Sequence, residues 1–447
     1  MIVPRNRLLI WVSALAPPLA LLAAAVPSLS VVCVVVIMAL GVVSIADALR
    51  ASSAVAGIDV RFPSVVRLSK DREGKLEVQI QNQSQKRRGM RIGVGLPDEV
   101  LATDPEQDVI LPSDAEWSRL TWDCVPRMRG KFRAGPVYVE GISPMGMWSI
   151  RKPIPAETEI RVYPDLMTER KSLASLFLRR GIQGFHLQRQ VGKGRDFEKL
   201  REYVPGDSYE DIHWKATARR AKPITKVFQI ERTQEIYVVV DASRLSARRQ
   251  ATSGVESGGP PILERMVTAA LVLGLAAQQQ GDLFGLITFT DKVEKFVRAK
   301  NGKAHYNTCR DALYTLQPQI VTPDFAELYT FIRMRLRRRA LIIFLTSLDD
   351  PALAENFVRS VELIRRQHLL VVNMIRQPGI EPLFSSPNVE SIDDVYRGLG
   401  GHLRWQKLRQ LEKTLQRRGV KFSLIDNERL SAELVSQYLN IKQKQLL

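Results

Sequence analysis

One short stretch of the chain crowds acidic and basic side chains around a single histidine: Asp207, Glu210, Asp211, His213 and Lys215. Acids together with a lysine are groups that a metal-dependent nuclease or other hydrolase can use, with the acids holding the ion. Such sites normally place their acids along strands, whereas the spacing here is helical. A histidine next to a tryptophan is more often a packed residue than a catalytic base. The stretch therefore favours a structural or binding role, and we do not expect an enzyme.

Two short helices are predicted to carry these groups. Asp196 is placed to cap the first helix, and Pro205-Gly206 would end it. Asp207 and the glutamate three residues later have the spacing of a capping box for the second helix. Interleaved charges beside aromatic residues suit a compact, ion-paired helical clamp. We expect this clamp to dock on the domain that begins at Ile236.

The run from Gly194 to Arg219 resembles the signature of the DUF58 family, Gly-x-Asp-Phe-Glu-x-Leu-Arg-Glu-Tyr-x-Pro-Gly-Asp followed by Ile-x-Trp-Lys-Ala-x-Ala-Arg. The resemblance extends back to Arg129-Gly-x-Phe132 and Ser143-Pro-Met-Gly-Met-Trp148, and forward into a von Willebrand factor A-like domain. Members are bacterial proteins without an assigned reaction. The resemblance implies a MoxR-type AAA+ ATPase as partner, in the assembly or maturation of an unknown client protein. The candidate packing or interaction residues of the signature are Arg201, Tyr203, Asp207, Asp211, Trp214 and Arg219.

Von Willebrand A-like domains typically hold a divalent ion with an Asp-x-Ser-x-Ser loop, a later threonine and an aspartate after the fourth strand. This chain keeps Asp241 and Ser243, but Leu245 takes the third position and Ser347 stands where the aspartate is expected. Losing a carboxylate and a hydroxyl weakens a magnesium site, so we expect no cofactor, with Mg²⁺ as the one candidate ion. The side chains that could substitute after a loop shift are Ser246, Thr322, Asp349 and Asp350.

The overall charge leaves a second interpretation open. The chain has 65 Lys and Arg against 47 Asp and Glu, a net charge of +18, which suits a nucleic-acid-associated protein. The basic residues are scattered along all segments, however, and a protein beside anionic lipid would carry the same excess. We therefore expect membrane lipid as a partner and do not expect nucleic acid. Three well-separated cysteines imply no disulfide framework.

The N-terminal region carries no charge from Leu8 to Ala46 and is broken near Pro27-Ser28. A cleaved signal peptide is one interpretation, but a second apolar run follows at once, so two spans joined by a short turn are favoured. Arginines at positions 5, 7 and 50 flank this hairpin on one side, which predicts cytoplasmic ends. The expected location is the bacterial cytoplasmic membrane, with the soluble domains in the cytoplasm.

Four regions follow from these patterns: two transmembrane helices (1–50), a β-sandwich (58–165), a connector with the signature helices (166–235), and an α/β domain (236–447). Period-two alternation predicts the antiparallel β-sandwich, as in Leu76-x-Val78-x-Ile80. A strand–helix rhythm predicts the last, Rossmann-like domain, whose apolar strands look buried on both faces. Its predicted strands are Ile236–Val240, Leu283–Thr288, Val293–Arg298, Leu341–Leu345, Leu369–Met374 and Lys421–Ile425, and its predicted helices are Glu264–Gln280, Phe325–Arg338, Ala352–Gln367, Leu403–Arg418 and Arg429–Leu439.

Overall fold

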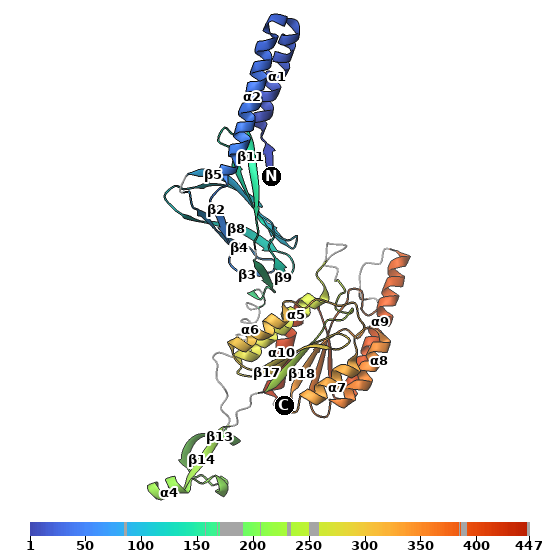
Figure 1. Ribbon diagram of the computed structural model, residues 1–447. Coiled ribbons are helices and arrows are strands. Elements are labelled where there is room, and N and C mark those ends of the chain that lie inside the picture. Colours follow the sequence, from blue (N-terminus) through green and yellow to red (C-terminus); the bar gives the residue numbers. More distant parts are fainter. Residues whose placement is uncertain are drawn as a thin grey trace. The chain divides into compact units, whose positions relative to one another are not determined.

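The computed structural model describes residues 1–84, 87–156, 158–167, 169, 191–205, 207–229, 234–249, 259–383, 385 and 391–444. The chain divides into two compact units, Met1–Asp165 and Leu166–Leu447, each described by itself (Figure 1). The predicted connector, Leu166–Gln190, lies outside the described residues except for Leu166, Met167 and Glu169.

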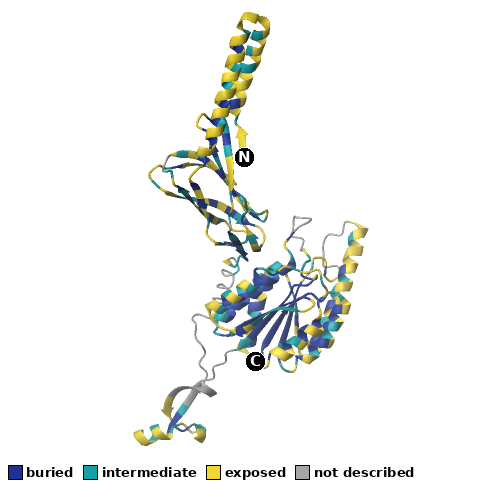
Figure 2. Ribbon diagram, viewed as in Figure 1, coloured by how far each residue is buried: buried dark blue, intermediate teal, exposed yellow. Residues whose placement is uncertain are grey.

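A helical hairpin opens the first unit. Helix α1 (Asn6–Ala25) and helix α2 (Ser30–Ala51) are joined by a 3-10 turn, Pro27–Leu29, at the predicted break. Both helices are long and apolar enough to cross a membrane, with mean hydropathies of 2.1 and 2.9 over their most apolar stretches. Their apolar side chains are largely exposed (Figure 2). Exposed apolar surface on this scale indicates association with a membrane.

The residues before the hairpin form an unpredicted strand. Strand β1 (Ile2–Pro4) pairs antiparallel with β11 (Trp148–Ile154), with Ile2 opposite Ile150. The ammonium group of Met1 donates to the carbonyl oxygen of Arg151 at 3.0 Å. The chain entering α1 is therefore held in place by pairing with β11.

A buried carboxylate fixes the other end of the hairpin. Asp47, near the end of α2, is 2% exposed and accepts hydrogen bonds from Ser143 Oγ at 2.6 Å and from the N–H groups of Met145 and Met147 at 3.0 and 3.3 Å. Trp148 Nε1 donates to the carbonyl oxygen of Ser44 at 2.9 Å. The Ser143–Trp148 segment thus forms a socket for the end of α2, a role that its sequence did not reveal.

The β-rich part of this unit packs one apolar core between its sheets. Its sheet orders are β1-β11-β10-β5-β7, β2-β4-β8-β6 and β3-β12-β9. Pairing is antiparallel except between β3 and β12, which run parallel, a departure from the predicted all-antiparallel arrangement. Trp122 and Ile80 of one sheet and Ile92 and Val139 of another are fully buried in the shared core. The remaining strands are β2 (Ile58–Arg61), β3 (Val65–Ser69), β4 (Gly74–Asn82), β5 (Arg88–Val94), β6 (Val100–Ala102), β7 (Glu106–Leu111), β8 (Trp117–Pro126), β9 (Gly130–Arg133), β10 (Val137–Ile142) and β12 (Glu159–Tyr163).

The second unit is built on a six-stranded sheet in the order β17-β16-β15-β18-β19-β20. All neighbours run parallel except β16 and β17. The six predicted strands are confirmed within two residues at every end, since most of them are short, dense apolar runs. They are β15 (Glu235–Asp241), β16 (Leu283–Phe289), β17 (Val293–Lys300), β18 (Leu341–Leu345), β19 (Leu369–Ile375) and β20 (Lys421–Ile425).

Helices cover both faces of this sheet, as the apolar strands predicted. Alternate residues of β15 point to opposite sides: Val238 joins the core under α5, α6 and α10, and Val239 joins the core under α7, α8 and α9 (Figure 1). The helices are α5 (Ile262–Gln279), α6 (Lys303–Leu313), α7 (Phe325–Arg335), α8 (Pro351–Ser360), α9 (Ile392–Arg417) and α10 (Leu430–Gln443).

Helix α9 begins 11 residues earlier than the predicted Leu403. Three glycines, at 398, 400 and 401, disfavour a helix on propensity alone and hid this part of it. The start is nevertheless well signalled, because Ser391 and Asp394 form a reciprocal capping box. The helix α6 was not predicted.

Candidate partner-binding surface

The signature is built on a two-stranded hairpin and not on two helices. The backbone of β13 (Val191–Glu202) pairs antiparallel with β14 (Ile224–Gln229), so the helix predicted after Asp196 is wrong. The register between β13 and β14 shifts at two places, as it does at a β-bulge. Its partner β14 is rich in β-branched and apolar residues and begins more than twenty residues after β13 ends. Pairing with β14 therefore determines the conformation of β13, despite the helical spacing in the sequence of β13 itself.

Asp207 closes a turn and does not cap a helix, which corrects the predicted capping box. Its carboxylate accepts from Arg201 at 2.6 Å and from the N–H group of Val204 at 3.2 Å. Helix α4 (Trp214–Arg220) begins later and is capped by His213, whose Nδ1 accepts from the N–H group of Ala216 at 3.1 Å. The ring nitrogen of His213 that faces the helix is therefore committed to its cap.

Large apolar side chains of this module are exposed. Trp214 is 69% exposed and Tyr209 is 75% exposed, and Tyr209 stacks on Tyr203 with 5.9 Å between ring centroids. Leu200 and Val204 are also exposed. We call Leu200, Val204, Tyr209, Trp214 and Arg219 the signature surface. Trp214 is thus not the packed residue that the clamp hypothesis required.

Ion pairing in the module is partial. Arg201 pairs with Asp207, and Lys222 lies 3.5 Å from Glu202. Within the described residues, neither Asp211 nor Arg219 makes an ion pair. The described part of the chain holds no group of three or more His, Cys, Asp or Glu side chains placed to bind a metal. The acids of the signature therefore do not converge there, and its aromatic surface is the more prominent feature.

Asp241 lies at the carboxyl end of β15, as predicted, but its oxygens are already used. The buried carboxylate accepts from the N–H group of Ser243 at 2.8 Å and from Thr346 Oγ1 at 2.5 Å. Burial raises the pKa of Asp241, and these hydrogen bonds oppose that effect. Leu245 is 1% exposed and belongs to the apolar core, so it offers no ligand at this edge.

The side chains that could have substituted in an ion site serve other contacts. Ser347 Oγ donates to Asp349 at 2.9 Å, and Asp349 also pairs with Arg248 and accepts from Gln377 Nε2 at 3.2 Å. Burial raises the pKa of the Asp349 carboxyl, but the hydrogen bond and positive charge of Arg248, together with hydrogen bonds from Ser347 and the backbone, outweigh burial and lower that pKa.

The other three substitutes are similarly engaged. Ser246 Oγ donates to the carbonyl oxygen of Ser243 at 2.9 Å, and Thr322 Oγ1 accepts from Arg244 at 3.3 Å. Asp350 caps α8, accepting from the N–H group of Ala352 at 3.0 Å. Protein donors and a guanidinium thus occupy the oxygens that a hard divalent ion would need, so this donor set does not fit such an ion.

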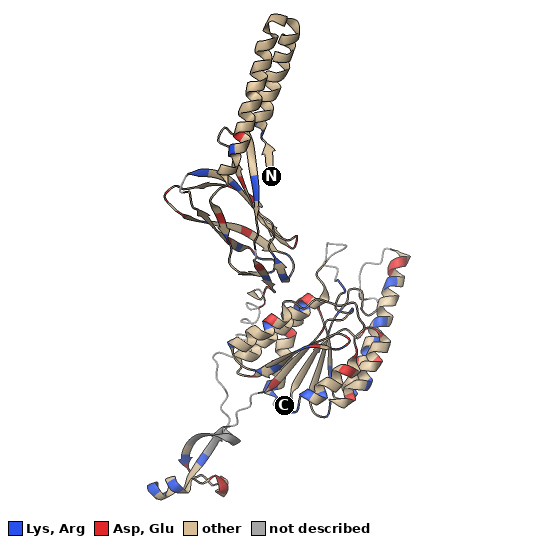
Figure 3. Ribbon diagram, viewed as in Figure 1, with Lys and Arg blue, Asp and Glu red and all other residues tan. Residues whose placement is uncertain are grey.

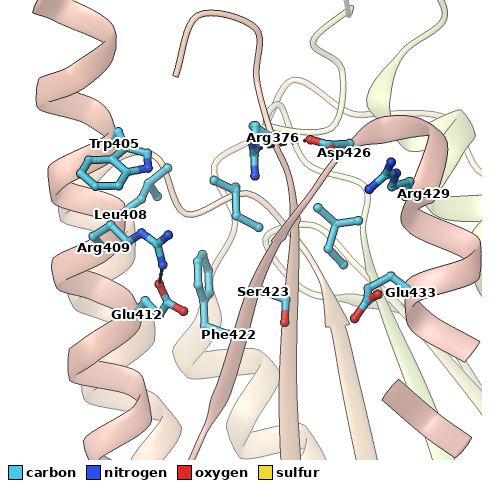
Figure 4. Close-up of a pocket in the computed structure, with 12 residues that line it drawn as sticks. Arg376, Trp405, Leu408, Arg409, Glu412, Phe422, Ser423, Asp426, Arg429 and Glu433 are labelled. Carbon is cyan, nitrogen blue, oxygen red and sulfur yellow. Dashed lines mark hydrogen bonds and ion pairs between the residues drawn. The ribbon is translucent and has the colours of Figure 1, made fainter. Parts of the chain in front are cut away.

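A hollow of about 390 Å³ lies at the edge of the sheet between α9, β20 and α10 (Figure 4). Arg409 pairs with Glu412 at 2.7 Å and Arg376 lies 3.4 Å from Asp426. With Arg429 and Glu433, three arginines face three acids, so the hollow has no net charge to select an anion. Its twelve lining residues are Arg376, Trp405, Leu408, Arg409, Glu412, Phe422, Ser423, Leu424, Ile425, Asp426, Arg429 and Glu433.

Comparison with known proteins identifies the class to which the signature belongs. Residues 199–383 match the family model described as "Protein of unknown function DUF58". The family predicted from the signature is thus the one whose model this stretch of the chain matches. The match covers the end of β13, the signature surface and the sheet as far as β19.

Relatives and solved structures resemble parts of the chain. Uncharacterized protein Rv1480 of Mycobacterium tuberculosis and Uncharacterized protein Mb1516 of Mycobacterium bovis are each 24% identical over 201 residues, which is 44% of this chain and 60% of each relative. The chain thus spans 60% of the length of these relatives. The crystal structure of the conserved hypothetical protein BatB from Bacteroides thetaiotaomicron is 15% identical, with a TM-score of 0.30, and covers 47% of this chain and 99% of its own. An aerotolerance-related membrane protein from Bacteroides fragilis is 12% identical, with a TM-score of 0.28 and the same coverage.

Proposed function

We propose that this protein is a membrane-anchored interaction protein whose signature surface binds a protein partner. The observation that carries the proposal is the exposure of Trp214 and Tyr209 in one module that also exposes Arg219. Tryptophan, tyrosine and arginine are the residues that most often dominate the energy of protein interfaces. A catalytic role has less support, because His213 caps α4 and Asp207 is held by Arg201.

The α/β unit acts in this proposal as a von Willebrand A-like domain that has given up its ion site. The strand order, the antiparallel edge strand β17 and the position of Asp241 at the end of a central strand support this assignment. Hydrogen bonds and the Arg248–Asp349 pair stand where the divalent ion of such domains would be held. The loops at this edge would then be fixed without a metal.

The helical hairpin anchors the protein with both soluble parts in the cytoplasm. The attachment of β1 and of Asp47 to one sheet system supports a retained hairpin over a cleaved signal peptide. Arginines at 5, 7 and 50 favour a cytoplasmic location of both helix ends by the positive-inside rule. A MoxR-type AAA+ ATPase is the partner suggested by the resemblance to the family, in assembly or maturation of a client protein.

The test compares capture of the ATPase by the full-length protein and by variants, in membranes. Tyr209→Ala with Trp214→Ala should weaken capture by about 30-fold, the loss expected when interface residues worth about 2 kcal/mol are removed. Trp117→Ala is the matched control, since Trp117 is a partly exposed tryptophan of the other unit. Equal capture by all variants would overturn the proposal.

Nucleic-acid association is the second candidate, favoured by the basic side chains that follow Trp214 on α4 (Figure 3). Binding of single-stranded DNA through a stacked tryptophan would fall with salt and with Trp214→Ala. If those variants lose DNA and keep the ATPase, the signature surface binds nucleic acid and the protein-partner proposal is wrong.

A further inference from the structure

Helix α9 is apolar on two opposite faces, and one of them is uncovered. At 100° per residue, five large apolar side chains of its first twelve residues fall within an arc of about 100°. We call these residues the α9 stripe: Ile392, Val395, Tyr396, Leu399 and Leu403. Their exposed fractions range from 44% at Leu399 to 75% at Ile392. Figure 2 shows this end of α9 exposed along several turns.

The opposite face of α9 is the one that packs on the α/β unit. Gly401, Leu408 and Leu415 are its buried residues. A side chain at Gly401 would collide with the carbonyl oxygen of Gly379, so glycine lets the helix lie directly on that loop. This contact fixes the rotation of α9 and turns the α9 stripe outward.

The α9 stripe has features of a surface that becomes covered. Glycines at 398, 400 and 401 each cost about 1 kcal/mol in a helix relative to alanine, which is unfavourable for a segment left in water. Further along the same face, Gln406 and Gln410 replace the apolar residues. The apolar character is therefore confined to the turns that lack a partner within the described residues.

Charged residues beside the α9 stripe indicate which partner covers it. Asp393 lies near the start of the helix, and at 100° per residue Arg404 and Lys407 lie three to four turns later on the same flank. When two helices pair antiparallel, equal flanks face each other, so a second copy would place its Arg404 and Lys407 beside Asp393. A parallel pair would instead set this flank against the opposite flank of the second copy, so Asp393 would not meet Arg404 or Lys407. The helix is thus complementary to itself in the antiparallel direction only.

We propose that the α9 stripe pairs antiparallel with the α9 stripe of a second copy, about a two-fold axis at Leu399. This register places Val395 opposite Leu403 of the second copy and covers the five apolar side chains. Two such stripes bury on the order of 1,000 Å² in total, slightly less than the ~1,200 Å² of stable interfaces in solution. The dimer is therefore weak in dilute solution and is favoured where copies are concentrated. It uses a surface separate from the signature surface.

Site-specific cross-linking of the full-length protein tests the register. Leu399→Cys should give a covalent dimer on oxidation or with a short bismaleimide, because the two-fold axis brings residue 399 of both copies together. Gln410→Cys is the matched control: it lies on the same face of α9, and this register places no helical residue opposite it. The native cysteines, Cys33, Cys124 and Cys309, are buried. A Leu399→Cys protein that stays monomeric, or that cross-links to a different protein, would overturn the proposal.

Charge reversal tests the direction of pairing. Asp393→Arg in the Leu399→Cys background should slow dimer cross-linking by about tenfold, a cost of about 1.4 kcal/mol. Adding Arg404→Asp and Lys407→Asp should restore the original rate, because the reversed pairs are again complementary. Reversal without effect, or a triple variant that remains slow, would refute antiparallel pairing. Trp214→Ala should cross-link like the parent, which separates this result from failure of the signature surface.

Discussion

Trp214 offers the sharpest test of whether the signature is a binding surface or part of a core. The perturbation is Trp214→Ala, and its control is Trp122→Ala in the β-rich unit, since Trp122 is 0% exposed. A buried tryptophan removes up to about 250 Å² from water, and its truncation costs about 3–5 kcal/mol. Trp214, at 69% exposed, removes only about a third of that area.

The smaller burial of Trp214 converts to about 2 kcal/mol at 25 cal/mol per Å², and this is an upper bound because the unfolded chain also shields apolar surface. Trp122→Ala should lower the melting temperature of its unit by about 10 °C. Trp214→Ala should change local stability of the hairpin by no more than about 2 kcal/mol, which corresponds to at most about 30-fold faster amide exchange.

Hydrogen exchange with mass spectrometry measures this in the full-length protein. The informative amides are that of His213, which donates to the carbonyl oxygen of Ile224 at 2.8 Å, and that of Tyr203, which donates to Pro223 at 3.0 Å. If Trp214→Ala accelerates their exchange by several hundredfold, Trp214 is a core residue. The signature surface would then be unavailable to a partner, and the reasoning from its exposure would be wrong.

Further expectations concern pH, metal, the socket and topology. Burial lowers the pKa of His368 to about 4, below its ordinary 6.5, so on acidification the unfolded chain binds the extra proton before the folded chain does. The free energy of unfolding should therefore fall by about 3 kcal/mol as pH drops from 6.5 to 4. His368→Gln should reduce this pH dependence in denaturation experiments. Magnesium at 10 mM should leave the melting temperature unchanged, since a site with a Kd of about 0.1 mM would add about 2.7 kcal/mol; a shift removed by Asp241→Ala would reveal a working ion site. Asp47→Ala strands three donors of the Ser143–Trp148 segment and should cost its unit about 4 kcal/mol in thermal unfolding, more than Asp47→Asn. A reporter that works only outside the cytoplasm should stay silent when fused at Leu447, and its activity would reverse the proposed orientation.

The sequence was most informative where structure is set by continuous apolar runs. Strands such as Leu341–Leu345 are buried on both faces, so their composition alone marks them. It failed for the signature, because the conformation of β13 depends on β14, which lies beyond Trp214 in the chain. The Asp-x-x-Glu pattern at Asp207 was locally compatible with a helix. In the structure, however, the carboxylate of Asp207 accepts hydrogen bonds from Arg201 and from the N–H group of Val204 in a turn.

Contacts between residues that are far apart in the sequence could not be predicted from local sequence patterns. Asp47 meets Ser143 across 96 residues, and nothing in the spacing of either predicts the other. One clue was Asp47, the first charged residue after the uncharged stretch, since a buried acid near the end of a spanning helix is costly unless it is hydrogen-bonded. The start of α9 was readable from the capping box at Ser391 and the apolar spacing that follows, but the glycines concealed it.

Strand β1 imposes an order of events on biosynthesis. Residues 2–4 are made about 145 residues before their partner β11, roughly 10–30 s earlier at ordinary rates of synthesis. During that interval both apolar helices of the hairpin are also made, while β1 stays unpaired. The sheet can close only when residues 2–4 and β11 lie at the same end of the hairpin. Until the sheet closes, one edge of β11 has no paired strand. In a chain that lacks residues 1–4, this edge of β11 would stay unpaired.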